Sequence, residues 1–305
     1  MFKLSCTRLV VLCLTLSAIG AAQTSFKYVS INYPGAYSTQ ANGINNGGEI
    51  VGTYTKSSCT VSCVTRGFKY VNKTFTSINF PGAYSTSVEG VNDYGDIVGS
   101  YITSADAVIT HGFLLLHGGH FETLDLTGLS QSNTSPFGVN KYLTVVGSYI
   151  DDSSAGVGFI WKNGNFTKVD LGGGAVQQSL NDDSNLGVMV GFFSRNGVPH
   201  MFLKKGSDVD VLPNTRTKAG TMQSGGVNGR GDVVGVVYGH AAIYAPQMER
   251  GEGSSDGPEP AFHYVELNFP GATQTAPSKI NYNRAIVGTY QKSDHVNHGF
   301  LAVPQ

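Results

Sequence analysis

Charged side chains are scarce in this 305-residue chain: they make up 13 % of it, and the formal net charge is −1. A nucleic-acid-binding protein normally shows a basic excess, so that class is excluded. Stretches rich in Ala, Leu, Glu and Lys are missing, which argues against a long helical protein. The chain is nevertheless 40 % hydrophobic, with 16 Phe and 15 Tyr, which is too apolar for a disordered protein. Its 40 Gly and its many Thr, Ser, Val and Tyr residues are typical of an all-β protein.

No hydrophobic run is long enough to span a membrane. The apolar run Leu9–Ile19 has 11 residues, whereas a membrane-spanning helix needs about 20. The run follows Lys3 and Arg8 and precedes small residues, so residues 1–22 are interpreted as a secretory signal peptide that is cleaved after Ala22. We therefore expect no membrane span, a soluble protein secreted to the periplasm or the medium, and a single domain over residues 23–305.

Cysteine is also scarce: of the four Cys in the chain, only Cys59 and Cys63 lie outside the leader. In an oxidising compartment the simplest interpretation is a disulfide that closes a short loop. Free thiols or a metal site are the alternatives, but zinc needs four ligands, and no CxxC or His pair accompanies these two residues. The sequence therefore predicts no metal and no cofactor.

The chain does contain a unit that is repeated six times. Each unit has an anchor Asn, usually preceded by an aliphatic residue, and then an aliphatic-Val-Gly run. The six anchors are Asn45, Asn92, Asn140, Asn181, Asn228 and Asn281. Their mean spacing of 47.2 residues is typical of the blades of a β-propeller. Unit 4 has extra residues between its anchor and its apolar run, which predicts a stretched turn there.

Each unit holds four strand signals, which we name A to D. Strand A ends at the anchor Asn, and strand B is the apolar run, whose final Gly allows a neighbouring backbone to approach closely. Strand C opens with a cluster such as His111–Phe113, and strand D is a run such as Phe121–Leu126. Segments such as Asn79–Ala83, between D and the next A, suit a type II turn. The His of the C cluster could join a ring of ligands or satisfy a backbone group, and we favour the second interpretation.

The two ends of the chain complement each other. Phe26–Tyr33 is a D-type strand without a unit of its own, and the last unit stops after its C strand, His298–Val303. Pairing of these two segments would complete the sixth sheet and remove its open edges. We therefore predict an all-β protein: a six-bladed β-propeller of four-stranded antiparallel blades, closed by the N-terminal strand pairing with the C-terminal strand.

The Gly-x-Asn-turn-Ile-Val-Gly core, the His-x-Phe cluster and the Asn-Phe-Pro-Gly-Ala segments recur over the whole chain after the leader. In these features the sequence resembles the HAF-type extracellular repeat family of secreted bacterial proteins, and His200–Phe202 comes nearest to the namesake triplet. The resemblance implies export and repetition. It implies no defined activity, so no functional residue is carried over from the family.

No catalytic constellation stands out in the sequence. Glu49, Asp96 and Asp232 recur at one position of the A–B turn, which favours a role in forming the turn. The B–C connections vary most in length, and variable loops on a regular scaffold are where function usually lies. We therefore expect a monomeric, non-enzymatic module that binds a glycan or a protein on the face bearing the B–C loops.

Tyr54, Tyr101, Tyr149 and Tyr290 close B strands and are the candidate ligand contacts. The alternative, which we favour, is that these rings pack between blades. An exported hydrolase or lyase acting on polysaccharide and a structural cell-envelope protein are the competing functions. The polar stretch around residues 248–260 is interpreted as a mobile insertion rather than a site.

Overall fold

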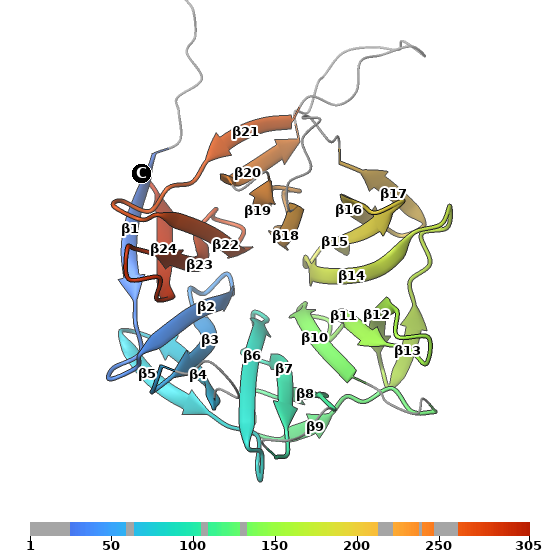
Figure 1. The fold of residues 1–305 in the computed structure, drawn as a ribbon, viewed down its shortest axis with the longest axis horizontal. Helices are drawn as coiled ribbons and strands as arrows, with labels where there is room; N and C mark the ends of the chain where they lie inside the picture. The colour runs from blue at the N-terminus through green and yellow to red at the C-terminus, as the bar shows by residue number, and fades with distance from the viewer. Residues whose placement is uncertain are drawn as a thin grey trace, which may run out of the picture.

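A computed structural model describes residues 25–58, 64–104, 109–128, 133–212, 222–237, 240–246 and 262–305. They form six four-stranded antiparallel sheets arranged around a central axis (Figure 1). The predicted six-bladed propeller is therefore confirmed. Within the described ranges no helix is long and apolar enough to cross a membrane.

The first three blades follow the chain in order, and each begins with the A strand that faces the axis. Blade 1 consists of β2 (Ser38–Ile44), β3 (Ile50–Thr55), β4 (Thr65–Val71) and β5 (Thr74–Ile78). Blade 2 consists of β6 (Ser85–Val91), β7 (Ile97–Ile102), β8 (His111–Leu115) and β9 (Phe121–Thr123). Blade 3 consists of β10 (Asn133–Val139), β11 (Val145–Ile150), β12 (Gly156–Lys162) and β13 (Asn165–Lys168).

The other three blades complete the ring. Blade 4 consists of β14 (Val176–Asp183), β15 (Val188–Arg195), β16 (Val198–Lys205) and β17 (Asp208–Val211). Blade 5 consists of β18 (Met222–Val227), β19 (Val233–Val237), β20 (His240–Pro246) and β21 (Phe262–Glu266). Blade 6 consists of β22 (Gln274–Ile280), β23 (Ile286–Gln291), β24 (His298–Pro304) and β1 (Phe26–Ile31).

Blade 6 closes the ring as predicted, because it takes its outer strand from the other end of the chain. β1 pairs antiparallel with β24, from Phe26 opposite Pro304 to Ile31 opposite Gly299. Figure 1 shows this blue strand lying beside the red one.

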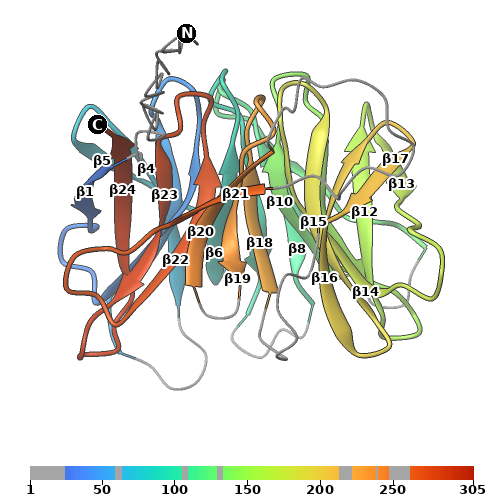
Figure 2. The same ribbon diagram turned by 90° about the horizontal axis from the view of Figure 1, so that it is seen from above.

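Each blade is a meander, so its connections alternate between the two ends of the ring, as the side view suggests (Figure 2). The A–B and C–D turns share one end, which we call the A–B face. The B–C and D–A connections share the other end, which we call the B–C face.

In five blades the Gly that ends the B run lies beneath an aromatic ring of strand C, whereas Gly235 of blade 5 faces Ala242. Gly99 faces Phe113, which is fully buried. A Cβ atom on Gly99 would lie 2.1 Å from the carbonyl oxygen of Ser87 and 2.9 Å from the Phe113 ring. Similar clashes occur at the matching positions Gly52, Gly147, Gly191 and Gly288. Glycine is therefore required by both the neighbouring backbone and the ring packed on it.

In five blades an anchor Asn organises the A–B turn and links it to the next blade. The Oδ1 atom of Asn92 accepts hydrogen bonds from the amides of Tyr94 (3.0 Å) and Asp96 (2.9 Å). Its Nδ2 atom donates to the main-chain oxygen of Asn140 in blade 3 (3.1 Å). Asn45, Asn228 and Asn281 donate in the same way to the anchor of the next blade, at 2.9 to 3.1 Å. The anchor is thus a buried side chain whose hydrogen bonds are used in two blades at once.

Blade 4 departs from the predicted register. Its turn is formed by Ser184, whose hydroxyl accepts from the amides of Leu186 (3.4 Å) and Val188 (3.1 Å), so Asn181 is not the anchor. The turn has the same length as the others, and the extra residues are absorbed by two irregularities in β14. The predicted stretched turn was therefore wrong, because a strand can take up an added residue as a bulge without lengthening the turn.

The glycine packing gives a first prediction. Gly99→Ala should lower the free energy of unfolding by about 1–3 kcal/mol or more, because the added methyl group overlaps a backbone oxygen and a buried ring. The control is Gly118→Ala, since a Cβ on Gly118 meets nothing within 4 Å and this glycine has no positive φ. Urea unfolding of both variants measures the effect, and equal stability of the two would contradict this packing argument.

Candidate functional site

Every A strand carries a β-bulge close to its end at the A–B face. At five of these bulges one extra residue lies between paired neighbours, for example Glu89 between Val88 and Gly90, whereas in blade 5 both Gly225 and Gly226 lie between Ser224 and Val227. The bulged residues of the six blades are Asn42, Glu89, Phe137, Asn181, Gly225 and Ser278. Because the A strands surround the axis, the bulges bring one residue from each blade to a common centre (Figure 1).

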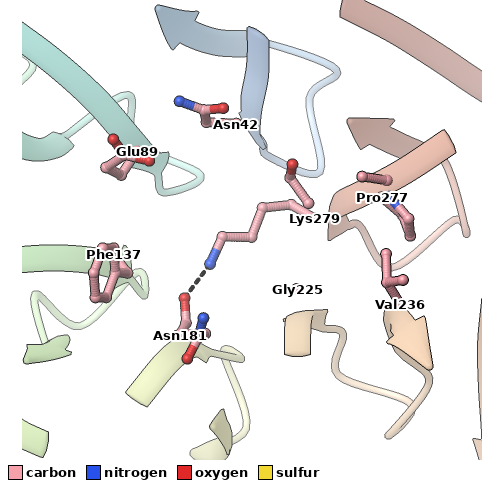
Figure 3. A pocket seen from close by; sticks show the side chains of 10 residues that line it. Asn42, Glu89, Phe137, Asn181, Gly225, Val236, Pro277 and Lys279 are labelled. Atoms are coloured by element: carbon pink, nitrogen blue, oxygen red, sulfur yellow. Dashed lines mark hydrogen bonds between the residues drawn. The ribbon is translucent and has the colours of Figure 1, made fainter. Parts of the chain in front are cut away.

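These bulged residues line a pocket of about 260 Å³ on the axis (Figure 3). The wall is completed by Val236 of β19 and by Ala276, Pro277 and Lys279 of β22. The lining therefore combines amide, hydroxyl, carboxyl, ammonium and aromatic groups. A concave site with a few convergent polar groups is the usual form of a small-molecule site.

One residue of the pocket lining, Lys279, forms an ion pair with Asp182 of blade 4. The residue after each bulge is glycine in four blades, whereas blade 4 has Asp182 and blade 6 has Lys279. Lys279 Nζ lies 3.0 Å from Asp182 Oδ1 and donates to the main-chain oxygen of Asn181 (Figure 3). Asp182 Oδ2 also accepts from the amide of Val227 in blade 5 (3.0 Å). Both charged groups are mostly buried, so each depends on the other.

The glycines at the same level bring neighbouring A strands together. A Cβ on Gly90 would lie 3.3 Å from the Cα of Gly138, so the A strands of these blades are in close contact there. Most of the pocket wall lies one to three residues earlier along the A strands, toward the B–C face, where these strands begin.

Among the described residues that line the pocket, Glu89 supplies the one carboxylate. Its Oε1 atom accepts from the hydroxyl of Ser87 (2.5 Å). Burial raises the pKa of Glu89, and the Ser87 hydroxyl and the charge of Lys279 oppose that rise only in part. The group is thus displaced toward its neutral form, in which it can donate a hydrogen bond.

A second acidic group lies deeper in blade 4. Asp183 is 4 % exposed and occupies a position where the other blades have a buried Ile or Val. Its Oδ2 atom accepts the link from Asn140 of blade 3 (2.8 Å), and its buried Oδ1 has no hydrogen-bond partner among the described residues. Burial, together with the negative charge of Asp182, raises the pKa of Asp183 to about 8.

The four tyrosines considered from the sequence are packed inside the blades. Tyr54, Tyr149 and Tyr290 are buried, and Tyr101 is half-buried. In three blades the ring stacks on an aromatic residue of the D–A segment, with centroids 3.7 Å apart. Those stacking partners are Tyr33, Phe80 and Phe269. Burial and stacking of this kind are what the packing alternative predicts for these rings.

The histidines of the C clusters cover these aromatic rings. His111 stacks on Tyr101 with centroids 5.0 Å apart, and its Nδ1 lies 2.7 Å from Asp125 Oδ2. His298 stacks on Tyr290 at 5.1 Å. Neither sequence interpretation anticipated this stacking. In the described ranges no group of three or more His, Cys, Asp or Glu is arranged to hold a metal ion.

The recurrent turn carboxylates stabilise their turns, as the sequence indicated. Glu49, Asp96 and Asp232 each accept from the Nδ2 atom of their own anchor Asn at 2.8 to 3.0 Å. Burial alone would raise the pKa of Asp96, but hydrogen bonds from the main-chain amide of His117 and from the Asn92 side chain hold that pKa below its ordinary value. Asp232 is bonded in bidentate fashion to Arg284, at 2.8 Å for both contacts.

Three sequence predictions concern residues outside the described ranges. They are the signal peptide over residues 1–22, the disulfide between Cys59 and Cys63, and the mobile insertion around 248–260. They remain predictions.

Sequence reasoning missed the bulged residues that line the pocket, because no motif marks them. A usable signal did exist. When the six units are aligned on their turns, the position three residues before the anchor changes from Asn to Glu, Phe, Asn, Gly and Ser, while the next position is glycine in four of the six units. Such variation within a regular scaffold is where function tends to lie.

Asp183 gives a prediction about pH. The folded protein retains the Asp183 proton up to about pH 8, whereas the unfolded chain releases it near the ordinary value of 3.8, so the folded state binds more protons between these limits. This group therefore makes the protein less stable as pH rises through that window, by at most about 1.4 kcal/mol per pH unit. Asp183→Asn keeps a hydrogen-bond acceptor for Asn140 and should remove this loss of stability with rising pH.

Urea unfolding of wild type and Asp183→Asn at pH 4.5, 6 and 7.5 measures the effect. The stability advantage of the variant should grow with pH. The exposed Asp208 of the same blade is the control, since Asp208→Asn should leave the pH profile unchanged. A constant difference between wild type and Asp183→Asn across the range would show that Asp183 is ionised in the folded protein.

No protein-family model matches this sequence, and no curated protein matches it. Solved structures with a similar fold include a gluconolactonase of Xanthomonas campestris, which is 9 % identical with a TM-score of 0.51 over 92 % of this chain and 90 % of that one. The sialidase of Trypanosoma rangeli is 7 % identical with a TM-score of 0.52 over 92 % of this chain, which spans 60 % of that sialidase. The Aleuria aurantia lectin is 8 % identical with a TM-score of 0.48 over 87 % of this chain and 91 % of that one. Likeness at this level of identity establishes a β-propeller and nothing finer.

Proposed function

We propose that the chain is an exported, monomeric, non-enzymatic binding module whose axial pocket takes a small polar ligand, such as the terminal residue of a glycan. The observation that carries the proposal is the lining of the pocket. The bulges of six blades bring amide, carboxyl, hydroxyl and aromatic groups to one point on the axis. The wall of the pocket extends from Lys279 toward the B–C face, the face on which the sequence predicts ligand binding.

The chemistry of the lining matches a sugar. The side chains of Asn42 and Glu89 can exchange hydrogen bonds with hydroxyl groups, and the ring of Phe137 offers an apolar surface for the face of a sugar. The volume of about 260 Å³ lies just below the usual range of ligand pockets, which begins at about 300 Å³. A polysaccharide would therefore enter by its end.

The single carboxyl group in the described lining of the pocket favours binding over hydrolysis. A glycosidase usually uses two carboxyl groups that flank the scissile bond. Glu89 is the carboxyl group that lines the pocket, whereas Asp182 is not part of the lining and is held by Lys279 and by the amide of Val227. The raised pKa of Glu89 is the one feature that favours the alternative of a hydrolase or lyase, because a neutral carboxyl can act as a general acid.

The bulge position allows a clean test. Blade 6 carries Ser278 at this position, so Glu89→Ser and Phe137→Ser copy a residue that the fold already accepts. The purified protein is screened on a glycan array, and its best ligand is titrated by calorimetry. Each variant should weaken binding by about tenfold or more, since each removes a contact worth roughly 1.4 kcal/mol.

Thermal unfolding of the variants is the control for folding. Release of a reaction product from the same ligand would contradict the proposal and show that the protein is an enzyme. Failure to bind any glycan, or binding that both variants leave unchanged, would reject the axial pocket as the site.

A further inference from the structure

The A–B face exposes large side chains that the fold does not require. The second residue after the anchor is Tyr94 in blade 2, Tyr142 in blade 3 and Leu186 in blade 4, and these are 64 %, 59 % and 63 % exposed. In blade 6 the first residue after the anchor, Tyr282, is 49 % exposed. Clustered exposed aromatic residues usually mark a binding surface.

Turn geometry does not explain these residues. The hydrogen bonds of the turn use the main chain and the anchor side chain, as at Asn140 with the amides of Tyr142 and Thr144. The position of Tyr142 is taken by Gly47, Arg230 and Asn283 in blades 1, 5 and 6. A turn that works with glycine, arginine or asparagine has no structural need for an exposed tyrosine.

The turns that carry these rings are tied to one another. Asp93 Oδ2 accepts from the side-chain amides of Asn46 (2.9 Å) and Asn185 (2.7 Å), which joins the turns of blades 1, 2 and 4. Asn46 Oδ1 accepts from the amide of Tyr282 (2.8 Å), which adds blade 6. Because these turns are held by hydrogen bonds, the aromatic residues that they carry lose little conformational entropy of the main chain when a ligand binds.

Exposed side chains of two other blades come together over blade 5 on this face. Blade 5 has Gly229 at the first turn position, and a Cβ there would be in van der Waals contact with the Tyr282 ring (3.5 Å) and with Leu186 (3.7 Å). The glycine therefore lets Tyr282 of blade 6 and Leu186 of blade 4 pack closely against the turn of blade 5. The next residue, Arg230, has its guanidinium 4.6 Å from the centroid of the Tyr282 ring.

Positive charge is available on this face. The described turns at this end carry exposed cations at Lys73, Lys162, Lys205 and Arg230 and a half-buried one at Lys141. Lys141 Nζ lies 5.0 Å from the centroid of the Tyr142 ring, so two of these cations accompany two of the exposed rings. Glu49 and Asp232 are already bonded to Lys69 and Arg284, and the exposed acids at these turns are Asp93 and Asp208.

We propose that the A–B face is a second binding surface, distinct from the axial pocket, and that it takes an acidic polysaccharide. A sugar ring can stack on an exposed tyrosine while its carboxylate or sulfate meets the adjacent Lys141 or Arg230. The spaced rings on a fixed circle match a chain of sugar units better than an acidic protein segment, which would need a continuous apolar core to bury.

The test uses polygalacturonate as the probe, with amylose as the neutral comparison, in affinity electrophoresis and calorimetry on the purified protein. The protein should be retarded by polygalacturonate and not by amylose, and its affinity should fall as salt is raised from 50 to about 300 mM. Arg230→Asn copies Asn283 of blade 6, and Tyr282→Asn copies Asn46 of blade 1. The double variant should bind polygalacturonate at least about tenfold more weakly.

Tyr37→Asn is the matched control, because Tyr37 is 47 % exposed on the B–C face, and it should bind as wild type does. The double variant should bind the best ligand from the glycan array as tightly as wild type does, which separates this proposal from the axial pocket. No retardation by polygalacturonate, or retardation that the double variant retains, would refute the proposal. Equal binding to poly-glutamate would refute it too, since charge alone would then account for the affinity.

Discussion

The buried amide of the turn asparagine is the interaction on which this ring depends. A blade is stable only if its faces are covered by the neighbouring blades. The anchor adds a directional hydrogen bond to this packing between blades. Through Oδ1 it fixes the turn of its own blade, and through Nδ2 it holds the main chain of the next. Because the bond passes from each blade to its neighbour, the angle between blades is set by hydrogen-bond geometry as well as by side-chain packing.

This rule fails at blade 4, and the sequence alone could not reveal it. Asn181 has the right residue type close to the right spacing, whereas Ser184 is the residue that forms the turn. The assignment of the anchor to Asn181 and its assignment to Ser184 differ by a bulge in β14. The bulge changes the register of strand A without changing the hydrophobic pattern of the strand B that follows. Serine has no amide to pass the link onward, and Asp183, in an aliphatic position, receives the bond from blade 3 instead.

Most of the fold was accessible because it is local and repeated. The period, the glycine beneath the C-strand aromatic ring and the unpaired strands at the chain ends each had a visible pattern. The site was not accessible, because it depends on which residue of each A strand is left unpaired at the axis. Glu89 and Phe137 look like ordinary strand residues until the bulge turns them inward. The tyrosines were conspicuous in the sequence for the opposite reason, since aromatic rings inside a blade also recur with its period.

The pairing of β1 with β24 also affects how the protein can assemble. The register joins Phe26 to Pro304, two residues at nearly opposite ends of the folded chain. Such a contact closes a very long loop, and contacts of this kind form slowly. Blades 1 to 5 are each contiguous in sequence and can form early, but blade 6 must wait with an unsatisfied β24 edge until β1 returns to it. During that interval the same edge could capture β1 of another copy, so the kinetics of one strand decide between a closed monomer and strand-exchanged assemblies.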